Sequence, residues 1–178
     1  AKIGERISAS YAQAARAKMK RALFDKLDEA HDFPAPPTLE EREFDSIWGE
    51  VKQQLEGDNA DEVREGKTDE ELEAEYRKLA ARRVRLGLLL AEIGKRNNIG
   101  VTEQDLSQAL RAQAANFPGQ EQLVYEYYQK NPQALGQVQA PILEEKVVDF
   151  IVELANVEKR AATPEDLAEE EEDKAGDA

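Results

Sequence analysis

The side chains best suited to catalysis are nearly absent from this 178-residue sequence. It contains one histidine, His31, and no cysteine. A Ser–His–Asp arrangement would have to use His31, which stands beside the Pro-rich segment 33–37 with no nucleophile nearby. Disulfides, thiolate metal sites and metal sites with two histidines are excluded. We therefore interpret His31 as an exposed or capping residue at a helix end, and we expect no catalytic centre.

Carboxylates are abundant, but their spacing gives no catalytic or metal-binding signal. With 38 Asp and Glu residues, pairs such as Glu40/Glu41 or Glu144/Glu145 follow from composition alone. Segment 57–65 offers oxygen ligands for Ca²⁺, yet it lacks the ligand spacing and the sixth-position glycine of a calcium loop. We interpret it as a solvated acidic loop. The ten glycines are scattered, so no phosphate-binding loop is predicted and no cofactor is expected.

Basic residues are densest at Arg82-Arg83-x-Arg85. RNA contact is one interpretation; the other is the polar side of an amphipathic helix paired with acidic neighbours, which the net charge of −14 favours. This charge argues against simple electrostatic binding to nucleic acid or to an anionic membrane. No run of about 18 apolar residues predicts a membrane span. No signal peptide is visible, which favours a cytoplasmic location, although the chain begins with Ala1 instead of Met.

The composition predicts helices with little bulky core. Ala, Glu, Lys, Arg, Leu and Gln dominate, and these residues favour helix. The hydrophobic fraction is 40%, but 26 of those residues are Ala and aromatic residues make up only 6% of the chain. No stretch alternates with period two long enough for a strand. We therefore predict an all-α fold, elongated and shallowly packed.

Apolar residues recurring every three or four positions predict six helices. Their approximate positions are 4–30, 39–55, 69–97, 102–116, a short helix around Leu123–Tyr128 ending before Asn131, and 133–157. Capping boxes are predicted at three helix starts. They are Thr38 with Glu41, Thr68 with Glu71, and Thr102 with Asp105. Pro141 predicts a kink or a break, residues 57–67 a loop, and the residues from Pro164 an acidic disordered tail.

Seven short blocks of sequence stand out when they are taken together and in order. They are Tyr11-Ala12-Gln13 to Lys20-Arg21, Leu27 through Phe33, Leu39 with Glu43-Phe44, Arg82-Arg83-Val84-x-Leu86-Gly87-Leu88-Leu89-Leu90-Ala91-Glu92-Ile93, Ile99-x-Val101-Thr102, Val124-x-Glu126-Tyr127-Tyr128-x-Lys130-Asn131, and Leu143-Glu144-Glu145-Lys146-Val147-Val148-Asp149-Phe150. Each block alone is a weak helical pattern. In this order and spacing, over about residues 1–160, they resemble the C-terminal region of the bacterial trigger factor family.

The resemblance implies a helical body with two protruding helical arms. It makes residues 1–34 a linker and body helix, 35–100 arm one, 101–140 arm two and 141–160 a body helix, with an acidic tail at 161–178. The parent protein would also carry an N-terminal ribosome-docking domain and a prolyl isomerase domain of the FK506-binding kind. Neither the Gly-Phe-Arg-x-Gly-Lys ribosome signature nor an isomerase sheet occurs in this sequence. Contact with a ribosome would therefore need a domain that is missing here.

The resemblance also implies an ATP-independent chaperone that binds unfolded or nascent polypeptides. Several shallow apolar patches would give weak contacts that add together, while the charge between them limits self-association. The resemblance is also compatible with a weak homodimer. The expected contact residues are Phe33, Leu39, Phe44, Ile47 and Trp48, with Phe117, Tyr125 and Tyr128 on the second arm. Tyr125, Tyr127 and Tyr128 cannot all face one core from a short helix, so at least one ring should reach solvent or a partner.

Two other interpretations fit the same residues. One is a different helical chaperone body, like the core of the periplasmic chaperones for outer-membrane proteins, which a parent with a secretion signal and a parvulin-type domain would support. The other is a helical adaptor or scaffold that recognises a single folded partner. A screen of unfolded clients separates the adaptor from a chaperone. An enzyme has almost no support from these residues.

Overall fold

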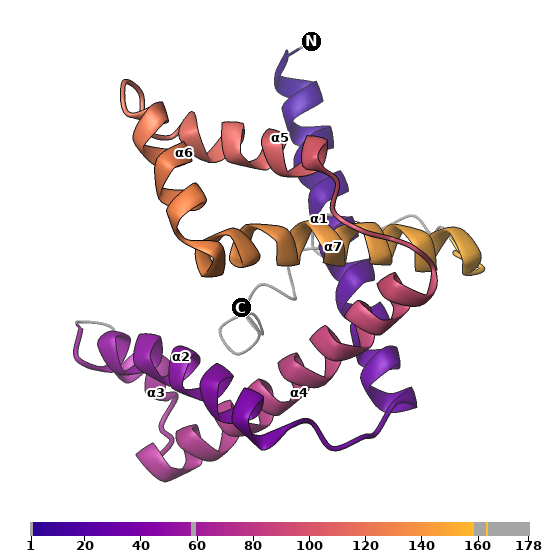
Figure 1. The fold of residues 1–178 in the computed structure, drawn as a ribbon. Helices are drawn as coiled ribbons and strands as arrows, with labels where there is room; N and C mark the ends of the chain where they lie inside the picture. Colours follow the sequence, from indigo (N-terminus) through magenta and orange to yellow (C-terminus); the bar gives the residue numbers. More distant parts are fainter. Residues whose placement is uncertain (1, 58–59, 159–162, 164–178) are drawn as a thin grey trace. The chain divides into compact units, whose positions relative to one another are not determined.

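The computed structural model describes residues 2–57, 60–158 and 163, and in these residues it contains seven helices and no strand (Figure 1). The helices are α1 (Lys2–Ala30), α2 (Pro37–Leu55), α3 (Ala60–Arg64), α4 (Asp69–Arg96), α5 (Glu103–Ala114), α6 (Glu121–Lys130) and α7 (Pro132–Leu154). The predicted all-α class is confirmed. The described residues divide into two compact units, one that contains residues 2–57, 60–86, 158 and 163 and the other residues 87–157.

The predicted helices are all present, and three details differ. The short helix α3 occupies part of the predicted loop at 57–67. Helix α7 continues through Pro141, so the predicted break does not occur. The predicted acidic tail lies, apart from Thr163, outside the described residues.

Two of the three predicted capping boxes are present. The Thr68 backbone N–H donates to the Glu71 carboxylate at 2.9 Å, and the Glu71 N–H donates to the Thr68 hydroxyl at 3.3 Å. Thr102 and Asp105 form the same pair of bonds at 2.8 and 3.2 Å. The box predicted at Thr38 is wrong, because α2 already begins at Pro37 and has no side-chain cap. Proline suits the first helical position, since its φ is fixed there and its missing N–H needs no partner.

Helix α4 ends where the sequence predicts, at the Asn97–Gly100 segment. Asn98 has the left-handed φ of 55°. The Ile99 N–H donates to the Gly94 carbonyl at 2.8 Å, and the Asn98 N–H donates to the Lys95 carbonyl at 3.4 Å. These two bonds form a Schellman motif, which satisfies carbonyls that the end of a helix would otherwise leave unpaired.

The core of the first unit lies between α2 and α4. Phe44, Ile47 and Val51, spaced along one face of α2, are buried together with Ala80 of α4. Larger, partly buried side chains pack around this centre. They are Trp48, Leu55, Val63, Tyr76 and Leu79. The fully buried centre is therefore small, as the composition predicts.

The second unit contains the C-terminal part of α4 together with α5, α6 and α7, and the last three helices contact one another. Val147 and Val148 of α7 are completely buried. A Cβ atom placed on Gly94 would lie 3.3 Å from Leu143 Cδ1 and 3.4 Å from Val147 Cγ2. Glycine at position 94 therefore lets α4 approach α7 closely.

Candidate functional site

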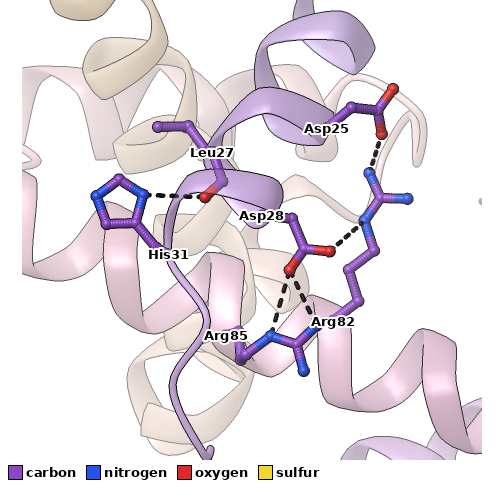
Figure 2. A network of polar contacts seen from close by, with 6 residues as sticks. All are labelled: Asp25, Leu27, Asp28, His31, Arg82 and Arg85. Atoms are coloured by element: carbon purple, nitrogen blue, oxygen red, sulfur yellow. Dashed lines mark hydrogen bonds and ion pairs between the residues drawn. The ribbon is translucent and has the colours of Figure 1, made fainter.

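His31 serves the end of a helix, as the sequence predicts. It is exposed and directly follows α1, and its Nδ1 donates a hydrogen bond to the Leu27 carbonyl at 2.9 Å (Figure 2). This bond satisfies one of the last carbonyls of the helix.

The basic cluster pairs with carboxylates of the same unit (Figure 2). Arg82 contacts Asp25, and its Nε lies 3.8 Å from Asp28 Oδ2. Arg85 donates to Asp28 Oδ1 from Nε at 3.2 Å and from Nη2 at 3.0 Å. Arg83 lies 3.5 Å from Glu43 of α2. The interpretation of Arg82-Arg83-x-Arg85 as a helix side paired with acidic neighbours is confirmed.

Asp105 links the start of α5 to α7. Lys146 of α7 donates to the Asp105 carboxylate and, at 3.2 Å, to the Gly100 carbonyl. The hydrogen bond from Lys146, followed by those from Thr102, lowers the pKa of Asp105 from 3.8 to about 2. One carboxylate therefore caps a helix and joins it to a neighbouring helix.

The eight predicted contact residues differ in exposure. Leu39 and Phe117 are exposed, at 37% and 52% of their surface. Four are half-buried: Phe33, Trp48, Tyr125 and Tyr128. Phe44 and Ile47 are buried, with 4% and 8% exposed. Leu39, Phe44, Ile47 and Trp48 therefore lie on one helix, α2, but only Leu39 and Trp48 keep part of their surface exposed to solvent.

Phe44 and Ile47 need a correction, because the prediction that they form an open strip does not hold in this structure. Phe44 stacks on Trp48 with ring centroids 5.9 Å apart, and the Arg77 guanidinium carbon lies over the Phe44 ring, 3.8 Å from its centroid. Trp48 also contacts Tyr76 of α4, at 6.0 Å between centroids. The apolar face of α2 is thus used against α4, and Trp48 is the ring at its margin.

The second unit exposes aromatic surface at a residue that the sequence analysis did not select. Tyr127 is 55% exposed, and Leu123, one helical turn earlier on the same face of α6, is 60% exposed. The prediction that at least one of the three tyrosines reaches solvent is confirmed, and the exposed ring belongs to Tyr127. The four-residue spacing from Leu123 to Tyr127 was a signal that could have identified this pair.

Other exposed apolar side chains lie on separate helices or just beyond them. They are Ile7 and Tyr11 of α1, Leu88 of α4, Leu154 of α7 and Val157 after it. Together with Leu39, Phe117, Leu123 and Tyr127 they make nine large apolar side chains that are at least about a third exposed in the described part of the chain. The exposed apolar side chains are therefore spread over several helices instead of gathered on one.

Within the described residues, no group of three or more His, Cys, Asp or Glu side chains is placed to hold a metal ion. None of the helices that the structure describes is long and apolar enough to cross a membrane.

The comparisons with known proteins agree over most of the chain. The family model for the bacterial trigger factor protein (TF) C-terminus matches residues 1–153. A protein named trigger factor from Xanthobacter autotrophicus is 54% identical over 168 residues, which cover 94% of this chain and 37% of that protein. Relatives of the same name from Parvibaculum lavamentivorans and Nitrobacter winogradskyi are 52% and 48% identical, over 93% and 96% of this chain and 32% and 38% of theirs.

The fold and the surface define an all-helical protein that presents apolar side chains on several separate helices. The matched residues identify its family. The chain belongs to the family of the bacterial trigger factor protein C-terminus, which confirms the resemblance seen in the sequence. It spans between about a third and two-fifths of the length of the curated relatives that it matches.

Proposed function

We propose that this chain is an ATP-independent chaperone module that binds unfolded or nascent polypeptides and prevents their aggregation. The observation that supports this function most directly is the distribution of the nine exposed apolar side chains over α1, α2, α4, α6 and α7 and the segments that follow α5 and α7. An unfolded client presents apolar side chains in no fixed order. Scattered, shallow apolar contacts suit such a client better than one enclosed pocket.

The affinity for a client comes from several weak apolar contacts that form together. Each exposed side chain buries a modest apolar area against a client and gives a weak, short-lived contact. Several such contacts on one client raise the overall affinity, because the second contact forms within an already bound complex. Release needs no nucleotide, since every individual contact is weak. The net charge of −14 limits association between empty copies of the chain.

The exposure of the side chains changes the set of proposed contact residues. Phe33, Leu39, Trp48, Phe117, Tyr125 and Tyr128 stay in the proposal because they are exposed or half-buried. The other exposed apolar residues join them: Ile7, Tyr11, Leu88, Leu123, Tyr127, Leu154 and Val157. Phe44 and Ile47 leave it because they are buried. The proposed arms are residues 35–100, which include α2, α3 and α4, and residues 101–140, which include α5 and α6.

For the full-length protein we propose further domains with separate activities. Ribosome docking and prolyl isomerisation would belong to parts of the trigger factor that this chain does not cover, since the chain spans under two-fifths of each compared relative. The module itself would act without a catalytic step.

The test measures aggregation of several unrelated, chemically denatured proteins on dilution into buffer without ATP. The purified chain should suppress light scattering at a few-fold molar excess. The double variant L123Q/Y127Q should suppress it less, because both substitutions remove exposed apolar surface while keeping good helix formers. The matched control Q108A/Q129A changes exposed polar residues of α5 and α6 and should behave like the parent chain.

Two outcomes would contradict the proposal. Absence of suppression for every client at several-fold excess would remove the chaperone function. Tight, stoichiometric binding to one folded protein, without binding to unfolded clients, would support a helical adaptor instead.

A further inference from the structure

Helix α4 belongs to both compact units. It is a continuous helix of 28 residues, and the boundary between the units falls inside it, between Leu86 and Gly87. A helix that crosses such a boundary either holds the two units rigidly or allows them to move. The stiffness of the helix at the boundary residue decides between these cases.

On the N-terminal side of the boundary, α4 is fixed to the first unit by side-chain contacts. Arg77 donates to Glu41 of α2 at 3.1 Å. Figure 2 shows that Arg85 donates to Asp28 of α1, at 3.0 Å. Ala80 lies in the buried core with α2. These contacts extend along α4 to Arg85, just before Gly87.

On the C-terminal side, α4 is fixed to the second unit by close packing. Leu90 is 5% exposed, and the backbone at Gly94 lies so close to α7 that a Cβ atom would be 3.3 Å from Leu143 Cδ1. The helix ends in the Schellman motif that leads to Gly100, whose carbonyl accepts a hydrogen bond from Lys146. Gly87 therefore lies between two anchored halves of one helix.

The two glycines of α4 differ in what the packing requires. Gly94 has no room for a side chain, as described above. A Cβ atom at Gly87, by contrast, would meet nothing within 4 Å, so alanine would fit there. Glycine inside a helix weakens the helix relative to alanine, because its backbone has more freedom to lose. Gly87 thus weakens α4 at the boundary without serving the packing.

We propose that Gly87 is a hinge in α4, at which the helix opens or bends and the two units change their relative orientation. A hinge of this kind is a short segment that absorbs changes in φ and ψ between two bodies that stay intact. Its motion belongs to the microsecond to millisecond range typical of domain hinges. This inference does not depend on the proposed function.

The first experiment measures amide hydrogen exchange in G87A. The amides of residues 88–90, whose helical hydrogen bonds to residues 84–86 span the boundary, should exchange about fivefold more slowly, the factor that corresponds to a glycine-to-alanine change in a helix interior. The matched control is G49A in α2, where a Cβ atom also meets nothing within 4 Å. G49A should leave exchange at residues 88–90 unchanged.

The second experiment measures the distance between the units. The chain has no cysteine, so spin labels can be placed on cysteines introduced at the exposed positions Gln53 and Gln108. The distance distribution should be narrower in G87A than in the parent chain and unchanged in G49A. If G87A were poorly folded by circular dichroism, G87Q would replace it, since glutamine also favours helix.

The proposed hinge is contradicted if G87A leaves both the exchange rates and the distance distribution as they are in the parent chain. It is also wrong if G49A narrows the distribution as much as G87A does, because the effect would then be general stabilisation.

Discussion

At the scale of single residues, Asp105 takes part in two interactions at once. It caps α5 through Thr102 and accepts a hydrogen bond from Lys146 of α7. Both interactions favour the ionised carboxylate, which is why its pKa is about 2 instead of 3.8. Loss of the proton from Asp105 is therefore coupled to the packing of α5 against α7.

A pH titration tests this coupling. Because the pKa of Asp105 is lower in the folded chain, its ionised form stabilises the fold above about pH 4, and this contribution is lost as the pH falls toward about 2. In K146M the pKa of Asp105, followed by the NMR shift of its carboxyl carbon, should rise toward 3.8. An unchanged midpoint in K146M would show that Lys146 does not hold the carboxylate.

Phe44 provides a second test at this scale. It is 4% exposed and stacks on Trp48, so F44A should lower the free energy of unfolding of the first unit by about 3–5 kcal/mol. L39A, at a position that is 37% exposed on the same helix, should cost less than about 1 kcal/mol. Trp48 is the only tryptophan, so its fluorescence during urea unfolding reports on both variants. Equal costs would contradict the assignment of Phe44 to the core.

Exposure of single residues was the hardest property to predict. The periodicity of Phe44, Ile47, Trp48 and Val51 identified an apolar face of α2 correctly. It could not tell whether α4 or a client covers that face, because both uses need the same residues at the same spacing. The same limit explains why Tyr125 and Tyr128 were selected ahead of Tyr127.

At the scale of helices, local chemistry predicted most boundaries. Thr68 and Thr102 each precede an acidic residue at the third position and form the expected capping boxes. Thr38 has the same pattern, but Pro36 and Pro37 precede it and start the helix earlier. Pro141 predicted a kink or a break, and the break does not occur, since α7 packs against α5 and α6 and tolerates the loss of one backbone hydrogen bond.

Two helical glycines, Gly94 and Gly136, should respond in opposite ways to substitution by alanine. G94A should destabilise the second unit by about 1–3 kcal/mol, because its Cβ would lie 3.3 Å from both the Ile99 carbonyl oxygen and Leu143 Cδ1. G136A in α7 meets nothing within 4 Å and should stabilise the chain by about 0.5–1 kcal/mol. Urea unfolding followed by circular dichroism measures both. A stabilising G94A would mean that α4 and α7 do not approach as closely as the structure indicates.

At the scale of the whole molecule, the family membership followed from seven weak blocks read in order, and no single motif would have been sufficient. The division into units was not predicted. The arm boundaries inferred from the resemblance place all of α4 in arm one, whereas compactness divides α4 between Leu86 and Gly87. The apolar periodicity of the sequence continues through that position, so the boundary between the units can be recognised only from the contacts in the folded structure.

At this scale we predict that the contributions of separate exposed residues to the free energy of client binding are additive. Substituting one exposed apolar residue, such as Ile7, Phe117 or Tyr127, should weaken binding of a labelled unfolded protein by a few-fold. Combining substitutions on separate helices should multiply these factors, since distant sites act independently. Fluorescence anisotropy gives the Kd of each variant. Complete loss of binding from one substitution, with no effect from the others, would indicate a single dominant contact site.

The nine partly exposed apolar side chains also bear on how the molecule responds to heat and cold. The heat capacity increase on unfolding comes mainly from newly wetted apolar surface. A chain that keeps part of this surface hydrated in its native state should therefore show a heat capacity increment below the usual value of about 12–15 cal/mol/K per residue. The curve of its free energy of unfolding against temperature would then be flatter, which differential scanning calorimetry can measure.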